Sequence, residues 1–108
     1  MPAALFVAAS ALLAGTLHGT VARWPTMPVC RVGTPCSAPA PHVALVFTRG
    51  ARVRRVETDR LGRYRAVLAA GTWSVRAPAA RLGFEPATVV VAPGRARLVD
   101  FTIDTGIR

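Results

Sequence analysis

Two neighbouring segments, residues 58–64 and residues 68–75, constrain the fold of this chain more than any other part of the sequence. In the first segment, Asp59 can close a turn with its side-chain carboxylate, and Gly62 can take the positive φ that such turns often use. In the second segment, Trp73 starts a new run of alternating apolar residues after a break. Short extended runs joined by tight turns predict a small β-sandwich.

Seven extended runs of this kind follow one another along the chain, with turn residues between them. Beyond the N-terminal segment, no stretch shows sustained helical periodicity. We therefore expect an all-β domain over residues 16–104, a seven-stranded sandwich of two sheets. Its interior should bring together Tyr64, Trp73, Val89 and Phe101. The expected strands cover residues 17–23, 43–48, 52–58, 63–68, 73–77, 87–92 and 99–104.

One of these strands has an irregular apolar pattern. Val53 and Val56 differ in parity, so a regular strand would place them on opposite faces. A β-bulge near residues 54–55 would return both valines to the core. We therefore expect a bulge at that point.

Residues 1–15 form an apolar leader, and no charged side chain occurs before Arg23. The leader has the length of a secretory signal core and is shorter than the roughly 20 residues that span a bilayer. We expect a short helix that is either a signal peptide or an uncleaved tether giving membrane association. A signal peptide usually carries Lys or Arg first, so either this leader is atypical or the true start lies upstream. Residues 105–108 are expected to form a C-terminal tail.

Cys30 and Cys36 enclose a short loop within a proline-rich connection, residues 24–41. We expect a structural disulfide, which would stabilise the fold by roughly 2 kcal/mol on the chain-entropy model. A metal site would need more Cys or His ligands, and His42 is the one near candidate. Persistent disulfides belong to oxidising compartments, so the pair indicates a secreted or cell-envelope protein.

The formal net charge is +9, and every one of the 14 basic side chains is Arg. One explanation is the coding bias of a GC-rich genome. The other is a surface that attracts polyanions, for which the candidate patch is Arg52, Arg54, Arg63 and Arg65. Aromatic residues that could stack on bases are not interleaved with these arginines, so nucleic acid is not an expected partner. Acidic envelope polymers or an anionic lipid surface fit better.

Several segments together resemble the carboxypeptidase regulatory-like domain family, which is related to the prealbumin-like and collagen-adhesin B-type modules. The resemblance covers about residues 17–103 and implies a Greek-key sandwich that serves as an accessory or surface module without chemistry of its own. The Cys30–Cys36 insert departs from the family pattern and looks like a variant of small exported bacterial proteins. The matching motifs are Gly19-x-Val21, Val43-x-Leu45-x-Phe47, Thr58-Asp59-x-x-Gly62-x-Tyr64, Ala70-Gly71-Thr72-Trp73-x-Val75 and Val99-x-Phe101-x-Ile103.

The residues needed for several activities are missing or scattered. A Lys–Asn isopeptide bond, common in collagen-adhesin modules, cannot form because the chain has neither Lys nor Asn. His18 and His42 lie in different segments, and the sequence has no His-x-x-Glu pair of the kind that would indicate a zinc site. Asp59 could bind calcium with Glu57, although the turn-closing role fits better. We therefore expect no catalytic residues, no metal site and no cofactor.

Trp24 is the candidate for ligand contact, because it lies in an irregular loop where an aromatic face can remain exposed. The leading hypothesis is a non-catalytic, exported cell-envelope module for surface recognition or structural support. Its partner would be an unknown envelope protein or an acidic or carbohydrate polymer. The alternative is a carbohydrate-binding module that uses Trp24, and a more distant alternative is a small hydrolase.

Overall fold

The computed structural model describes residues 13–107, and within that range the chain forms ten β-strands and no helix. The expected helical leader falls outside the described residues except for its last three positions. Of these, Leu13 lies in a turn, whereas Ala14 and Gly15 belong to the first strand. That strand therefore begins two residues before the domain boundary predicted at residue 16.

The first sheet is built around the long strand β1, which changes partners along its length. Its first half pairs with antiparallel β5 on one side and parallel β9 on the other. Its second half pairs with antiparallel β2 and parallel β10, and β7 adds to the far edge of β10. The six strands are β1 (Ala14–Trp24), β2 (Ala38–Pro39), β5 (Arg63–Ala69), β7 (Phe84–Glu85), β9 (Ala96–Leu98) and β10 (Phe101–Asp104).

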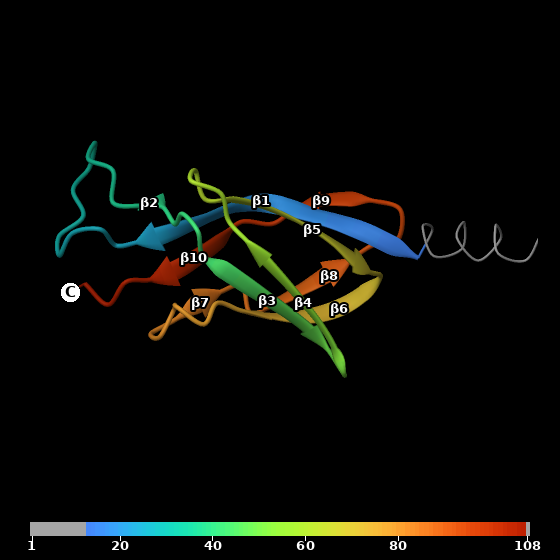
Figure 1. Ribbon diagram of the computed structural model, residues 1–108. Helices are drawn as coiled ribbons and strands as arrows, with labels where there is room; N and C mark the ends of the chain where they lie inside the picture. The colour runs from blue at the N-terminus through green and yellow to red at the C-terminus, as the bar shows by residue number, and fades with distance from the viewer. Residues whose placement is uncertain (1–12, 108) are drawn as a thin grey trace, which may run out of the picture.

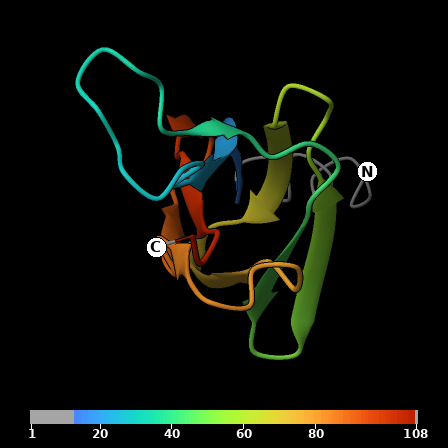
Figure 2. The same cartoon turned by 90° about the vertical axis from the view of Figure 1, so that its left-hand side faces the viewer.

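The second sheet has four strands in the order β4-β3-β6-β8, all antiparallel to their neighbours. Its members are β3 (Ala44–Arg49), β4 (Arg52–Glu57), β6 (Gly71–Arg76) and β8 (Thr88–Val91). The two sheets form separate layers (Figures 1 and 2), and their apolar faces meet between them. The chain is thus a two-sheet, all-β sandwich.

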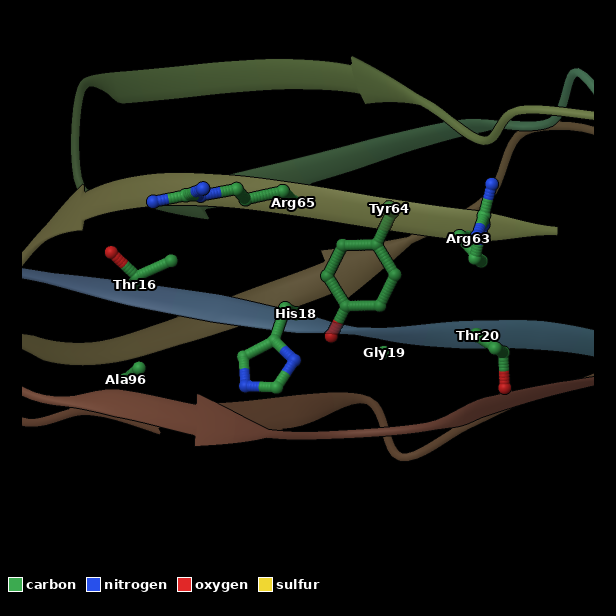
Figure 3. Close-up of a pocket in the computed structure, with 8 residues that line it drawn as sticks. All are labelled: Thr16, His18, Gly19, Thr20, Arg63, Tyr64, Arg65 and Ala96. Carbon is green, nitrogen blue, oxygen red and sulfur yellow. The ribbon is translucent and has the colours of Figure 1, made fainter.

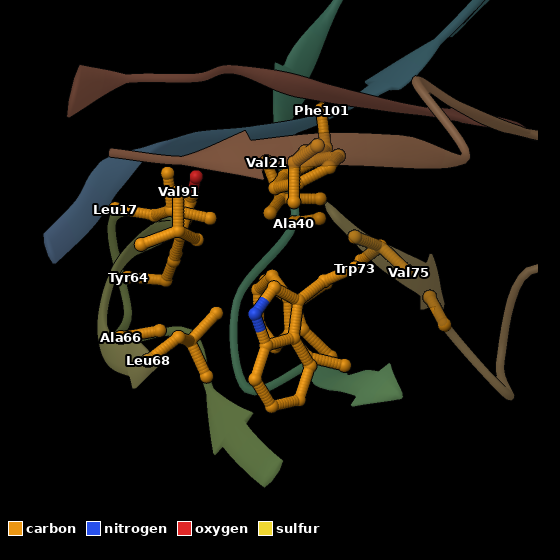
Figure 4. Packing of buried hydrophobic residues seen from close by; sticks show 14 of the residues in the cluster. Leu17, Val21, Ala40, Tyr64, Ala66, Leu68, Trp73, Val75, Val91 and Phe101 are labelled. Carbon is orange, nitrogen blue, oxygen red and sulfur yellow. The ribbon is translucent and has the colours of Figure 1, made fainter. Parts of the chain in front are cut away.

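The interior contains the four side chains that we expected there, and Figure 4 labels three of them, Tyr64, Trp73 and Phe101. Tyr64, Trp73, Val89 and Phe101 all belong to one buried cluster, and each is at most 5% exposed. The Phe101 ring lies at the centre of the aromatic packing, with ring centroids 5.0 Å from Phe84 and 5.4 Å from Tyr64. The Trp73 indole N–H donates to the Ala69 carbonyl at 2.8 Å, so burial leaves no polar atom of this ring unsatisfied.

The predicted count of seven strands is wrong. Two of the additional strands, β2 and β7, are two-residue pairings inside segments expected to be loops. The third, β9, covers residues 96–98 and lies before the last expected strand, whose first two residues, Val99 and Asp100, separate β9 from β10. There the Asp100 carboxylate accepts a 2.9 Å hydrogen bond from the Thr20 backbone N–H, replacing a backbone partner for β1.

The predicted β-bulge in residues 52–58 is also wrong. β4 pairs with β3 without interruption, from Arg52 opposite Arg49 to Glu57 opposite Ala44. Val53 therefore stays on the outer face and is 65% exposed, whereas Val56 packs beside the core. β4 is an edge strand, and an edge can leave one valine in solvent without a bulge to rescue it.

Candidate functional site

The turn after β4 is closed by Asp59. One carboxylate oxygen, Oδ1, accepts hydrogen bonds from the backbone N–H groups of Leu61 and Arg63, both at 2.9 Å. The other oxygen, Oδ2, lies 2.9 Å from Arg63 Nε. The bond from the Arg63 backbone is the largest cause that lowers the pKa of Asp59 below its ordinary value. Asp59 is thus engaged within its own turn, and Gly62 completes that turn at φ 77°.

No observation favours a calcium site at Asp59 and Glu57. Glu57 instead lies 3.5 Å from Nδ1 of His42, and both side chains are exposed. Within residues 13–107, no group of three or more His, Cys, Asp or Glu side chains is arranged to hold a metal ion. His18 lies in the first sheet, whereas His42 precedes β3 of the second, so the two histidines do not form a common site.

A shallow depression of about 550 Å³ lies along the β1–β5 pair (Figure 3). Cross-strand pairing places His18 opposite Arg65 and Thr20 opposite Arg63, so these four polar side chains share one face of the sheet. Both arginines are exposed, as the alternation of β5 requires. This face offers positive charge and a histidine, but it encloses no side chain in a deep cleft.

Tyr64 also borders the depression, and its geometry shows a structural role. Tyr64 stands opposite Gly19, and its hydroxyl donates a 2.6 Å hydrogen bond to the Val99 carbonyl beyond β1. Burial, and secondly the Asp100 carboxylate, raise the pKa of Tyr64 far above its ordinary value of 10.0. The hydroxyl therefore stays protonated at neutral pH, which suits a hydrogen-bond donor and not a nucleophile or base.

The structure divides the predicted anionic-partner patch between the two sheets. Arg63 and Arg65 project from the outer face of β5, and Arg63 is already bonded to Asp59. Arg52 and Arg54 lie on the edge strand β4. Arg54 pairs with the core residue Phe47 of β3, so the two arginines are on the face of the second sheet that is directed toward the interior. Arg52 instead lines a second depression, of about 500 Å³, together with residues at the start of β1. Two of the four arginines thus lie on each sheet.

Trp24, the predicted ligand contact, ends β1 and is 49% exposed. A depression of about 260 Å³ borders it on one flank and one of about 440 Å³ on another, and Asp104 lines both. Glu85 adds a second carboxylate to the smaller depression, and Thr102 adds a hydroxyl. An exposed indole with hydrogen-bonding groups beside it can stack on a flat apolar face of a ligand and orient its polar groups.

The two carboxylates beside Trp24 were not predicted from the sequence. Parallel pairing of β1 with β10 places Asp104 next to Trp24, and pairing of β10 with β7 places Glu85 next to Thr102. These residues are far apart in the sequence, and no local pattern marks their meeting. The Asp104 carboxylate also accepts a 2.8 Å hydrogen bond from the Gly106 N–H, which orients it.

The loop after Trp24 is cross-linked by a disulfide between Cys30 and Cys36, whose Cα atoms are 5.5 Å apart. The Thr26 N–H donates to the Cys36 carbonyl at 2.9 Å and ties the base of the loop together. Cys30 also lines the larger depression beside Trp24. The cross-link therefore fixes a wall of the candidate ligand site.

The solved structures that are similar to this chain include two that each have 14% sequence identity and a TM-score of 0.57. One is the Bacillus anthracis TIE protein, where the match covers 84% of this chain and 16% of that chain. The other is GBS52, the minor pilin of the Gram-positive pathogen Streptococcus agalactiae, where it covers 86% and 45%. The chain spans less than half the length of either protein, and at this identity the likeness establishes the fold alone.

No protein-family model matches the sequence, and no curated protein matches it. Within residues 13–107, no helix of the length and apolar character needed to cross a membrane is present.

Proposed function

We propose that this chain is a non-catalytic, exported module of the cell envelope, with the Greek-key arrangement of the carboxypeptidase regulatory-like and collagen-adhesin B-type domains. It acts through surface recognition or as a stable structural unit. The observation that carries the proposal is the filled interior. Apolar side chains from both sheets occupy it, and Thr58 is the one buried polar residue among residues 13–107. Recognition must therefore occur on the outside of the sandwich.

The buried Thr58 fits this structural role. Its hydroxyl donates to the Ala40 carbonyl at 2.7 Å and accepts from the Val43 N–H at 2.8 Å. A buried hydroxyl with both functions satisfied stabilises the chain path and is not free for chemistry. The similarity in fold to part of a minor pilin, together with the Cys30–Cys36 disulfide, supports an extracellular or envelope location.

Cell fractionation tests this proposal directly. The untagged chain, expressed with residues 1–15 in its native host, should be recovered from the envelope or the medium. A cytoplasmic marker protein and a known exported protein provide the matched controls. Recovery with the cytoplasmic marker would contradict the proposed location.

A second candidate function is carbohydrate binding at Trp24, and the observation that favours it is the pair of depressions beside the exposed indole. Aromatic faces stack on sugar rings, and carboxylates such as Glu85 accept hydrogen bonds from sugar hydroxyls. The partner would then be a carbohydrate polymer of the envelope.

A glycan array on the oxidised chain tests this function, with Trp24→Ala as the test variant and Leu61→Ala as the control. Leu61 is 48% exposed, similar to Trp24, and lies in the turn after β4. Sugar-dependent binding should disappear in the first variant and persist in the second. Binding that survives Trp24→Ala, or the absence of any sugar dependence, would remove this candidate.

A further inference from the structure

The acidic residues of the sandwich gather toward one end, whereas arginines occur at both ends. The sequence has five acidic residues, and all five lie in the part of the fold near the second half of β1. Asp100 bonds to Thr20, Asp104 pairs with Trp24, and Glu85 pairs with Thr102 of β10. The remaining two, Glu57 and Asp59, flank Thr58, whose hydroxyl bonds to Ala40 beside Val21.

The opposite end of the sandwich, where β1 begins, has no acidic side chain and carries arginines. Arg49 and Arg52, which flank the turn of the β3–β4 hairpin, line the 500 Å³ depression together with Leu13 and Ala14. Arg95 lies in the turn after β8, and its carbonyl accepts a 2.9 Å hydrogen bond from the Thr16 N–H. We call these three arginines, with the start of β1, the basic end; Figure 1 shows this end of β1 beside the turns after β5 and β8.

The basic end also exposes apolar side chains. Leu13 is 64% exposed and Val67 is 52% exposed, and both line the depression that Arg49 and Arg52 border. Residues 1–12, which precede Leu13 in the sequence, contain no Asp, Glu, Arg or Lys. Guanidinium groups around exposed apolar side chains match the boundary between lipid phosphates and acyl chains.

We propose that the basic end binds the surface of an anionic phospholipid membrane. Arg52 and Arg95 contact lipid phosphates there, and Leu13 and Val67 enter the headgroup region. Arg49 also has a structural role, because its Nη1 donates a 2.6 Å hydrogen bond to the Ala70 carbonyl. This bond holds the β3–β4 hairpin against the end of β5. The acidic residues and Trp24, at the opposite end, then face away from the membrane.

This proposal deepens the envelope role proposed above by naming the surface on which the module rests. The two can fail separately, because vesicle binding is measured on the purified chain and does not depend on where the cell sends it. Failure to bind vesicles would leave an envelope location possible, and a cytoplasmic location would leave lipid binding intact.

Vesicle flotation with the full chain tests the proposal, using vesicles of phosphatidylcholine alone and vesicles that also contain phosphatidylglycerol. The test variant is Arg52→Gln with Arg95→Gln, and the control is Arg60→Gln with Arg81→Gln. All four side chains are exposed, and each pair removes two positive charges. The control arginines lie in turns near the acidic residues, so the two variants differ in position and not in net charge.

We expect the unaltered chain to prefer phosphatidylglycerol vesicles and to lose that preference as salt is added. The test variant should bind these vesicles about tenfold more weakly or worse, whereas the control should bind within about twofold of the unaltered chain. Equal losses in both variants would show attraction by net charge alone and would overturn the proposal. Equal binding to both kinds of vesicle would also overturn it, because only apolar contact would then remain.

Discussion

The hydroxyl of Tyr64 on β5 donates a 2.6 Å hydrogen bond to the carbonyl oxygen of Val99, on the far side of β1. The bond is possible because Gly19, opposite Tyr64, has no side chain; a Cβ there would collide with the Val99 carbonyl. One tyrosine thus connects three neighbouring segments of the first sheet at the interruption between β9 and β10. It is the single tyrosine of the sequence, so its ionisation can be followed without interference.

Titration of the folded chain by ultraviolet absorbance should show Tyr64 ionising well above its ordinary pKa of 10.0, because burial and Asp100 disfavour the phenolate. A raised pKa means that the stabilisation is fully present below pH 10.0 and is lost as the pH rises toward the folded value. The free energy of unfolding should therefore fall above that pH. The chain in denaturant is the control; matching titration curves in both states would contradict the assignment.

Replacing Tyr64 by Phe should lower the free energy of unfolding by about 1 to 2 kcal/mol, because the Val99 carbonyl loses its donor while the ring remains buried. Urea denaturation followed by tryptophan fluorescence measures the change. The variant should also lose the fall in stability above pH 10.0 that Tyr64 causes. Unchanged stability at neutral pH would show that the hydrogen bond contributes nothing.

The free energy of unfolding should also depend on pH in the acid range, because of Asp59. Its pKa is lowered below 3.8 in the folded chain, chiefly by the Arg63 backbone N–H, so its stabilisation is present above pH 3.8 and is lost as the pH falls through the folded value. We expect the difference in free energy of unfolding between the unaltered chain and Asp59→Asn to shrink as the pH falls below 3.8. Denaturation curves collected across this pH range provide the measurement, and a constant difference would refute the prediction.

Gly62 and Gly94 allow a matched test of backbone contact. Both have positive φ, 77° and 69°, but a Cβ on Gly62 would lie 2.6 Å from the Val21 carbonyl oxygen, whereas a Cβ on Gly94 would meet nothing. Gly94→Ala should therefore cost only the left-handed penalty of roughly 1–2 kcal/mol. Gly62→Ala should cost clearly more, as measured by thermal or urea unfolding. Equal costs would show that the turn relaxes away from Val21.

Replacing both Cys30 and Cys36 by Ser should lower the free energy of unfolding by about 2 kcal/mol, because the loop that the disulfide closes is short. The core lies elsewhere, so the variant should still fold. Reduced, unaltered chain is the control and should show the same loss. A much larger loss would mean that the loop supports the sheets, contrary to its exposed position.

The parts of the fold that could be predicted from the sequence are those determined by residues close together in the chain. Residues 63–68 alternate strictly, so Tyr64, Ala66 and Leu68 had to share the buried face. The Asp59 turn is similarly encoded within a few residues. The bulge predicted at residues 54–55 was wrong because parity does not reveal that β4 is an edge strand, where Val53 can remain in solvent.

The candidate sites depended on contacts that local sequence does not encode. Trp24 could be chosen as exposed from its proline-rich surroundings, but Glu85 and Asp104 reach it only through the pairing of β1, β10 and β7. Likewise, the four arginines predicted as one patch are divided between β4 of the second sheet and β5 of the first. Arg95, in a turn that hydrogen bonds to the start of β1, belongs to the basic end through tertiary contact alone.

The proposed envelope role is tested most directly by the thiol state of the chain recovered from its native host. Mass spectrometry after alkylation, with and without prior reduction, should show Cys30 and Cys36 protected in the envelope or exported fraction and reactive only after reduction. Free, alkylated cysteines in chain recovered with the cytoplasm would contradict an exported, disulfide-bonded module.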